Sequence, residues 1–384
     1  MQRSIALDVF RGLTVALMIL VNNPGSWSHV YAPLLHAPWH GFTPTDLVFP
    51  FFLFAVGNAS AIVLPRLWEE NRSLFFQKVL KRTLLIFLIG LCLNWVPFFV
   101  WVGDELKFKS WTWINAEGIE VGLRIFGVLQ RIALSYGLAA VLCYFFPKRV
   151  LATSLVLLLI YWGLCLIFGH GPDIYSIEGW FGTHVDRFLF GPVHLYQGDG
   201  APFDPEGLTS ALPSVAQVML GFWAGNKLIK TEKRLVLREF ALYGLAMVGV
   251  GLLWSLVHPI NKKIWTGSYV LVTTGLALWL LAILVGQLDI KGKRGWWVTV
   301  MEAFGKNPLF IYVMSGLIPK TLALTRIPHL DGKYLTPFQW FYEHVCAHFP
   351  GSPNNGSLLY AIILVSAYGA LALWLDKKKI YFKV

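Results

Sequence analysis

Residues 22–57 of the chain read NNPGSWSHVYAPLLHAPWHGFTPTDLVFPFFLFAVG. This stretch leaves one apolar segment, crosses a polar loop rich in His and Trp, and enters a second apolar segment through Thr45 and Asp46. Pro24 and Gly25 stop the first helix, and the dipole of the second helix favours a carboxylate such as Asp46 at its start. The stretch therefore predicts two apolar helices joined by a polar loop.

The composition is typical of a protein that lies in lipid. The mean hydropathy is +0.59 and only 14% of the residues are charged, against about 25% in soluble domains. A helix needs roughly 20 apolar residues to cross the hydrocarbon core, whereas a transmembrane β-barrel requires alternating apolar residues. We therefore expect an all-α, polytopic integral membrane protein. About ten apolar segments are long enough to be transmembrane helices: 5–23, 44–65, 79–101, 122–146, 150–168, 209–229, 238–257, 267–286, 300–319 and 357–376.

The basic residues predict the orientation, because Lys and Arg in short loops are retained on the cytoplasmic side. An N-terminus inside the cell places the majority of the 32 Lys and Arg residues on the inner side. Both termini are then cytoplasmic, and the net charge of +11 indicates topology and attraction to anionic lipids rather than nucleic-acid binding. The first segment has no small-residue cleavage site after it, so we expect it to remain as a span. The outer loops are predicted at 24–43, 102–121, 169–208, 258–266 and 320–356.

Three histidines stand in the first outer loop, His29, His36 and His40. No acidic or Cys ligand flanks them, so we expect no metal. Imidazole is also the side chain best suited to proton transfer near neutral pH, although polar residues beside Trp are common at a membrane surface without any catalytic role. The four cysteines form no CxxC spacing, which argues against a disulfide framework.

Charged residues within the apolar segments are the next candidates for function, because intramembrane charges usually face a bundle interior or a cavity. Asp8 and Arg11 lie one helical turn apart and can simply pair. Gln130 and Arg131 are expected near the middle of the membrane, with Arg124 on the same helical face. No partner is visible nearby in the sequence, so these side chains suit a carbonyl, carboxylate or phosphate ligand.

The outer loop 169–208 is far longer than a connection requires, and such loops are usually functional or disordered. Its aromatic and acidic residues are compatible with a saccharide site or with a folded cap. Further along, Asn261, Lys262 and Trp265 stand at the outer entry of the eighth predicted span.

A series of motifs in one order resembles the transmembrane domain of the heparan-alpha-glucosaminide N-acetyltransferase family and its bacterial glucosamine N-acetyltransferase relatives. The resemblance covers essentially the whole chain as a single transmembrane acyltransferase domain, 1–384. It implies an inner-membrane enzyme that transfers acetyl from cytoplasmic acetyl-CoA to a glucosamine-type amine on the outer side. The motifs are LDVFRGLTVALMILVN, LLHAPWHGFTPTDLVFPFFLF, RIFGVLQRIALSY, VDRFLFGPVHLYQ, FDPEG, INKKIWTGSYV and KKKIYFKV.

The resemblance places the active-site histidine of the family at His36, with an aspartate at Asp46 and an asparagine at Asn22. His36 can act as a general base or as a nucleophile that forms acetyl-imidazole. Asp46 would orient its ring, and Asn22 would donate to the thioester oxyanion. Contacts to acetyl-CoA are expected from Arg11, Arg124, Gln130, Arg131 and Asn307. Contacts to the amino-sugar acceptor are expected from Trp39, His194, Asp204, Glu206, Asn261, Lys262 and Trp265.

Two alternative functions stay open. A transporter or exporter of sugars or lipids would use the intramembrane charges to line a path, although the inverted repeats of such folds are absent from the sequence. A membrane O-acyltransferase of envelope polysaccharide would apply the same histidine chemistry to a hydroxyl. By analogy with the family, a homodimer is also expected, with membrane lipids as further partners and no nucleic acid.

Overall fold

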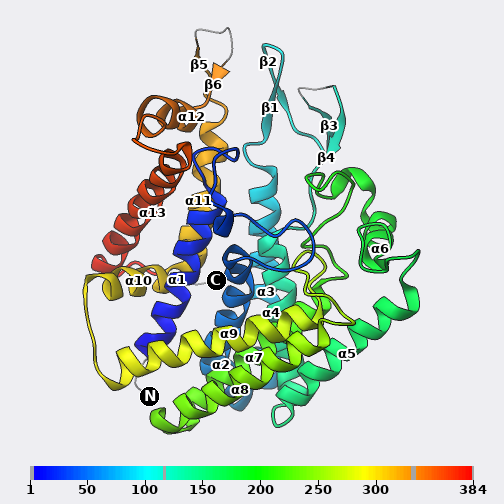
Figure 1. Ribbon diagram of the computed structural model, residues 1–384, viewed down its shortest axis with the longest axis vertical. Coiled ribbons are helices and arrows are strands. Elements are labelled where there is room, and N and C mark those ends of the chain that lie inside the picture. Colours follow the sequence, from blue (N-terminus) through cyan, green and yellow to red (C-terminus); the bar gives the residue numbers. More distant parts are fainter. Residues whose placement is uncertain (1–3, 116–117, 330–333, 383–384) are drawn as a thin grey trace.

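The computed structural model describes residues 4–115, 118–329 and 334–382, and it is mostly helical (Figure 1). Parts of the predicted outer loops 102–121 and 320–356, and the last two residues of the KKKIYFKV motif, lie outside these described residues. Seven helices within them are long and apolar enough to cross a membrane. These are α1 (Ile5–Asn22), α2 (Val48–Glu70, extended backward by η2, Pro44–Leu47), α4 (Val128–Phe145), α5 (Val150–Phe168), α8 (Lys233–Trp254), α9 (Gly267–Leu284, continued by the π-helical turn η4, Val285–Ile290) and α13 (Pro353–Lys377).

Two more predicted spans are long helices that are less apolar. They are α3 (Arg72–Trp95) and α7 (Ala211–Lys230). Helix α7 packs inside the bundle against α2, whereas α3 packs against α4 and leaves Leu80, Leu84 and Leu88 exposed. The structure therefore supports a polytopic membrane protein with seven candidate spans rather than the full set of ten.

The ninth predicted span, 300–319, is wrong as a single helix. The structure divides it into α10 (Trp296–Lys306) and α11 (Pro308–Leu322), which point in different directions (Figure 1). Pro308 explains the break, because proline lacks an N–H and clashes with the preceding turn, yet fits the first position of a new helix.

The segment between α3 and α4 also differs from the prediction. After α3 the chain forms two hairpins, β1 (Phe99–Val102) with β2 (Glu105–Phe108) and β3 (Thr112–Ile114) with β4 (Glu120–Gly122). Helix α4 begins only at Val128, so the prediction that Arg124 shares a helical face with Arg131 is wrong. The Asn94 amide holds this segment extended, since its Nδ2 donates to the carbonyls of Arg124 and Phe126, each at 3.0 Å.

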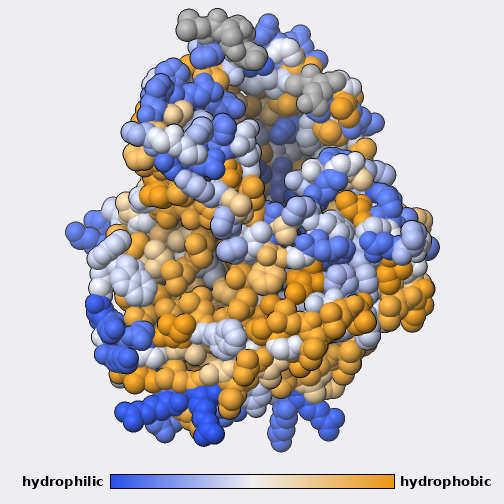
Figure 2. Space-filling view, viewed as in Figure 1, coloured by the Kyte–Doolittle hydropathy of each residue, from blue (hydrophilic) through white to orange (hydrophobic). Residues whose placement is uncertain are grey.

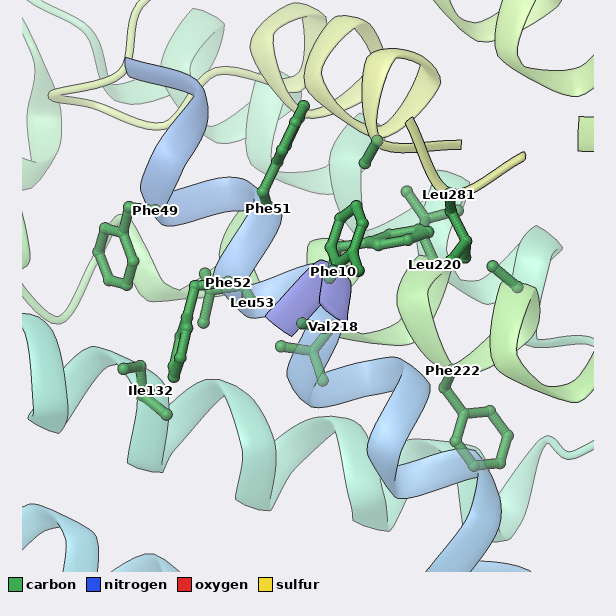
Figure 3. Packing of buried hydrophobic residues seen from close by; sticks show 14 of the residues in the cluster. Phe10, Phe49, Phe51, Phe52, Leu53, Ile132, Val218, Leu220, Phe222 and Leu281 are labelled. Atoms are coloured by element: carbon green, nitrogen blue, oxygen red, sulfur yellow. The ribbon is translucent and has the colours of Figure 1, made fainter. Parts of the chain in front are cut away.

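Helices α1, α2, α4, α7 and α9 contribute to one apolar core (Figure 3). Phe10 of α1 packs against Phe51 and Phe54 of α2, with ring centroids 5.8 Å apart in both pairs. Helices α2 and α7 also approach closely through their backbones, since a Cβ added at Gly57 would lie 2.0 Å from the Val218 carbonyl oxygen. Small residues permit such close packing of helices in lipid.

Helices α5, α8 and α13 lie at the outside of the bundle. Only 28% of the most apolar window of α5 is buried, against 72% for the span that contains α2. Figure 2 shows apolar side chains across the lower part of this face, whereas the end that carries the hairpins is mostly hydrophilic. This distribution is that of lipid-facing helices below a solvent-exposed cap. The remaining elements are short: η1 (Ala32–Leu34), α6 (Phe181–Phe190), η3 (Pro192–His194), β5 (Ile327–Pro328), β6 (Tyr334–Leu335), α12 (Pro337–Phe341) and the π-helical turn η5 (Tyr342–Cys346).

Candidate active site

The His36 ring is held by the buried carboxylate of Asp46. The two side chains meet at 2.6 Å between Nδ1 of His36 and Oδ1 of Asp46. The other oxygen of Asp46 accepts from the backbone N–H of Thr43 at 2.9 Å and of Ala37 at 3.0 Å. Because an ionised carboxylate can only accept, the hydrogen of a neutral His36 ring lies on Nδ1 and leaves the lone pair on Nε2. Asp46 is 1% exposed and the His36 side chain 41%, so a rigid buried acceptor orients a reachable base.

Local sequence explains this arrangement. Thr43 and Asp46 form a capping box at the start of η2, in which each side chain accepts from the other's backbone N–H. The same Asp46 carboxylate that closes the cap also reaches back to the loop that carries His36. Capping and ring orientation, which the sequence left as alternatives for Asp46, are therefore performed together.

Lys262 completes the cluster from the loop before α9. Its Nζ lies 3.0 Å from Nδ1 and 3.2 Å from Nε2 of His36, and 3.5 Å from Oδ1 of Asp46. The N–H of Nδ1 and the lone pair of Nε2 point apart in the ring plane, so an ammonium almost equidistant from both nitrogens lies against the ring face rather than in line with either. Burial lowers the pKa of Lys262, and the carboxylates of Asp46 and Glu206 oppose that effect.

The loop that carries Lys262 is docked on the first outer loop. The backbone N–H of Gly41 donates to the Ile260 carbonyl at 2.7 Å, and Gly41 also bridges to Asn261. Asn261 is buried, and its Oδ1 accepts from the backbone N–H of Ile264 at 3.1 Å. Asn261, which was expected to contact the acceptor, thus shapes the loop and lies outside the cavity lining.

A cavity of about 360 Å³ opens beside His36. It contains six of the residues that the sequence singled out: His36, Trp39, Asp46, Arg124, Glu206 and Lys262. Ala37, Val128, Tyr196, Asp199, Pro205 and Lys263 complete its lining. The cavity is thus polar on most sides and has an aromatic wall at Trp39 and Tyr196.

A smaller pocket of about 100 Å³ adjoins this cavity, with which it shares His36, Glu206 and Lys262. Asn22 reaches the site through this pocket, as the last residue of α1. Its remaining walls come from the outer ends of α1, α2 and α4 and are mainly apolar: Met18, Val21, Thr45, Val48, Phe49 and Val128. The two pockets therefore meet at His36, the smaller one between the ends of α1, α2 and α4 and the larger one among the loops.

Arg124 is paired, contrary to the expectation that it has no partner. It donates from Nε to Asp204 Oδ2 at 2.8 Å and from Nη2 to Asp204 Oδ1 and Glu206 Oε2, both at 2.6 Å. Burial alone would raise the pKa of Glu206, but Arg124 and Arg131 outweigh burial and hold that pKa below its usual value. The partners lie about 80 residues away in the long outer loop, so no local pattern in the sequence reveals them.

Arg131 and Gln130 lie in the core beside the cavity. Nη2 of Arg131 donates to the carbonyls of Pro205 at 2.8 Å and Gly207 at 3.1 Å, and to the Ser210 hydroxyl. Arg131 therefore supports the loop that presents Glu206. Gln130 is buried against the Gly90 face of α3.

Five other predicted site residues lie away from the cavity lining. Arg11 is bonded to Asp8 at 2.5 Å, and the Asn307 amide holds the C-terminal segment through Ile380 and Phe382. Nδ1 of His194 lies 2.8 Å from the Leu123 carbonyl oxygen. Trp265 is buried against Phe49, Tyr269 and Arg131. Asp204 is also buried, and it supports the site through Arg124 and through the backbone N–H of Glu206, which donates to its Oδ1 at 3.0 Å.

Sequence reasoning missed several members of the site. Thr43 could have been found, because the TPTD sequence is a capping-box pattern. Lys263 carries no such signal, whereas Tyr196 and Asp199 were expected only as part of the aromatic and acidic set of the loop 169–208. Lys263 pairs with Asp199 at 2.5 Å and lies 5.6 Å from the centre of the Trp39 ring, so it closes the outer edge of the cavity. Within the described ranges, no group of three or more His, Cys, Asp or Glu side chains has the arrangement of a metal site.

Comparison with known proteins gives concordant results. The family model for the catalytic region of heparan-alpha-glucosaminide N-acetyltransferase matches residues 3–260. Heparan-alpha-glucosaminide N-acetyltransferases of Mus musculus and Homo sapiens are each 26% identical to this chain, over 98% and 99% of its length. The chain spans about 60% of the length of these relatives. The family match contains His36, Asp46 and the Arg124 cluster, and the alignments with the two relatives also cover the Lys262 loop.

Proposed function

Because the chain belongs to the heparan-alpha-glucosaminide N-acetyltransferase family, we propose that it is a membrane N-acetyltransferase. It transfers the acetyl group of acetyl-CoA to the amine of a glucosamine-type sugar. The observation that carries the proposal is the His36–Asp46 pair at the junction of two pockets, one between the ends of α1, α2 and α4 and one among the loops. A donor and an acceptor that enter from opposite sides would meet at this pair.

In the proposed reaction His36 acts as general base through Nε2. The acceptor amine must lose a proton to attack the thioester carbonyl. The new carbon–nitrogen bond forms, the carbon–sulfur bond breaks, and the proton passes by way of His36 to the leaving thiolate. Asp46 stabilises the imidazolium that forms on the way. A positioned base of this kind contributes typically about 10² to 10⁴-fold in rate.

The competing route is a relay in which His36 itself takes the acetyl group. Nε2 would then attack the thioester carbonyl, and the carbon–sulfur bond would break to release the thiolate of CoA. The amine would next attack acetyl-imidazole, the bond from the acetyl carbon to Nε2 would break, and the proton lost by the amine would pass to the thiolate. Incubation of the purified protein with labelled acetyl-CoA and no acceptor separates the two routes. Labelled acetyl that stays on the wild-type protein but not on His36→Ala supports the relay. Transfer of acetyl to the sugar in a single turnover, with no labelled protein detected, supports the general base.

The smaller pocket suits the acetyl thioester. Met18, Val48 and Phe49 give it an apolar wall, and Asn22 supplies an amide that can donate to the developing oxyanion. We assign the donor path to the region along α1, which leads from Arg11 to Asn22. Contacts of Gln130, Arg131 and Asn307 to the donor remain predictions, and the first two would act by supporting the walls of the site.

The larger cavity suits the sugar. Trp39 offers a flat apolar face for a pyranose ring, and Glu206 attracts the ammonium form of the amine before it is deprotonated. Lys262 and Lys263 add hydrogen-bond donors for ring hydroxyls. The terminal glucosamine of a larger glycan and a free amino sugar both present this chemistry.

The direct test is product analysis. Purified protein in lipid vesicles is given labelled acetyl-CoA and a panel of amino sugars, and the products are separated by mass and by sensitivity to mild base. An N-acetyl product that requires His36 supports the proposal. An O-acetyl product would favour an O-acyltransferase, and passage of unmodified sugar across the vesicle would favour a transporter.

A further inference from the structure

A second cavity, of about 630 Å³, lies at the far end of α7 from the candidate active site. The candidate site adjoins the start of α7 at Ser210, and this cavity adjoins its end at Lys230, 20 helical residues later. Such a helix is about 30 Å long, so the two cavities are independent. The lining comes from the α4–α5 turn, the first turn of α5 and the end of α7: Pro147, Lys148, Arg149, Val150, Leu151, Ala152, Trp223, Asn226, Lys227, Lys230 and Thr231.

The charge of this cavity is of one sign. Four of its lining residues are cationic and none is acidic. Lys227 pairs with Glu239 of α8 at 2.9 Å. No ion pair joins Lys148, Arg149 or Lys230 to an acidic side chain in the described part of the chain. Three cationic side chains therefore converge on one cavity without a counter-ion from the protein, which is the arrangement that a phosphate group requires.

The surroundings of the cavity are those of a lipid rather than of a soluble anion. Above it, α5 exposes Leu155, Val156 and Leu159, and the face of α8 that carries Tyr243 also exposes Val250. Only 28% of the most apolar window of each of these two helices is buried. Trp223 lines the cavity and packs edge-on against Tyr243 of α8, with ring centroids 4.9 Å apart. A molecule whose headgroup occupies the cavity can thus place its chains on lipid-facing helix surfaces.

We propose that this cavity binds the phosphate headgroup of an anionic phospholipid, whose acyl chains lie along the exposed faces of α5 and α8. The headgroup is held by Lys148, Arg149 and Lys230, with Asn226 and Thr231 as hydrogen-bond partners. A lipid in this position bridges the α4–α5 turn to the end of α7. The site is distinct from the acetyl-transfer site and does not depend on the proposed reaction.

Native mass spectrometry of the detergent-solubilised full chain tests this assignment. The protein is incubated with phosphatidylglycerol or with phosphatidylcholine, and the lipid-bound fraction is titrated. We expect a marked preference for phosphatidylglycerol. The variant Lys230→Gln is expected to weaken phosphatidylglycerol binding about fivefold, since each basic residue near an anionic surface contributes about a kilocalorie. The triple variant Lys148→Gln, Arg149→Gln, Lys230→Gln is expected to bind both lipids equally.

The matched control removes the same charge elsewhere. The triple variant Lys291→Gln, Lys293→Gln, Lys378→Gln alters three exposed basic residues outside the cavity and should keep the preference of the wild type. Equal losses in the two triple variants would overturn the site, because they would show a general charge effect. The soluble anion 3′,5′-ADP is tested in the same way. If it displaces the lipid, and if it binds the wild type but not the cavity triple variant, the cavity is a site for a soluble phosphate ester and the lipid assignment is overturned. Acetyl transfer is measured in parallel, and its presence or absence leaves this result unchanged.

Discussion

At the scale of single residues, the site depends on one carboxylate with two tasks. Asp46 caps η2 through Thr43 and holds the His36 ring through its other oxygen. Because one side chain caps the helix and also orients the His36 ring, any displacement of Asp46 disturbs both interactions. This explains why a loop that is otherwise polar and open presents its histidine in one orientation.

The substitution Asp46→Asn tests that role. The amide is the same size and can still accept from Thr43, but its N–H₂ group can face His36 and favour the wrong ring tautomer. We expect kcat to fall by about 10² to 10⁴-fold, with protein yield and thermal unfolding close to those of the wild type. Acetyl transfer by Asp46→Asn at the wild-type rate would show that ring orientation by Asp46 is unimportant.

Sequence reasoning singled out His36 and Asp46 because both lie in one motif of the family resemblance, and the structure brings their side chains together. It also selected Glu206 and Lys262, although it could not show that they meet at His36. The partners of Arg124 escaped it, because 80 residues separate them from that guanidinium in the chain. Contacts of that kind depend on tertiary packing, which no local pattern encodes.

At the scale of elements, the packing of α2 on α7 positions the site. Helix α2 begins just after Asp46, and α7 follows the loop that carries Glu206. A Cβ at Gly221 would lie 2.1 Å from the Phe54 carbonyl oxygen, as close as the corresponding approach at Gly57. These two glycines therefore set the distance between the two halves of the site.

Alanine at either glycine should push the helices apart. We expect Gly57→Ala or Gly221→Ala to lower the free energy of unfolding by about 1–3 kcal/mol, as overpacking usually does, and to reduce activity as well. Gly163→Ala in α5 is the matched control, because nothing lies within 4 Å of its added Cβ, and it should be neutral or slightly stabilising. Thermal unfolding in detergent measures all three, and equal stability of Gly57→Ala and Gly163→Ala would contradict this packing.

The buried His258 gives the Lys262 loop a dependence on pH. Its Nε2 accepts from the Gly267 backbone N–H at 3.0 Å, and burial lowers the pKa of His258 from 6.5 to about 3. Below pH 6.5, His258 is protonated in the unfolded chain but stays neutral in the folded chain. The free energy of unfolding therefore decreases as the pH falls from 6.5 toward 3. The slope is at most about 1.4 kcal/mol per pH unit.

The measurement for this effect is thermal unfolding of the wild type and of His258→Gln between pH 7.5 and 4.5. Gln can still accept the Gly267 hydrogen bond but does not titrate. We expect the stability difference between the two proteins to shift in favour of the variant as the pH falls. A difference that is constant across this range would contradict the assignment.

At the scale of the whole molecule, most helices could be predicted because long apolar runs have few alternatives in lipid. The break between α10 and α11 was missed, although Asn307-Pro308 is a helix-stopping pair. The hairpins between α3 and α4 were missed because most of their residues lie in the charged stretch 102–121, which the sequence predicts only as a loop, while most of β1 falls in the predicted span 79–101. Composition thus predicts which segments form apolar helices, but it predicts the ends of those helices much less well.

The topology remains a prediction and can be measured by cysteine labelling. In a cysteine-free background, Trp27→Cys places a thiol in the first outer loop and Lys378→Cys places one after α13, both at exposed positions. An impermeant maleimide should label position 27 in intact cells and position 378 only after permeabilisation. The opposite pattern would invert the orientation and place His36 on the cytoplasmic side.

The central claim is that His36 performs acetyl transfer at the junction of the two pockets. The most direct measurement compares wild type, His36→Ala and the control His29→Ala, which changes a histidine of the same loop outside both pockets. Each protein is reconstituted in vesicles with labelled acetyl-CoA and glucosamine, and N-acetylated sugar is counted. We predict product from the wild type and His29→Ala and none from His36→Ala, with donor binding intact in all three. Product from His36→Ala at the wild-type rate would contradict the claim.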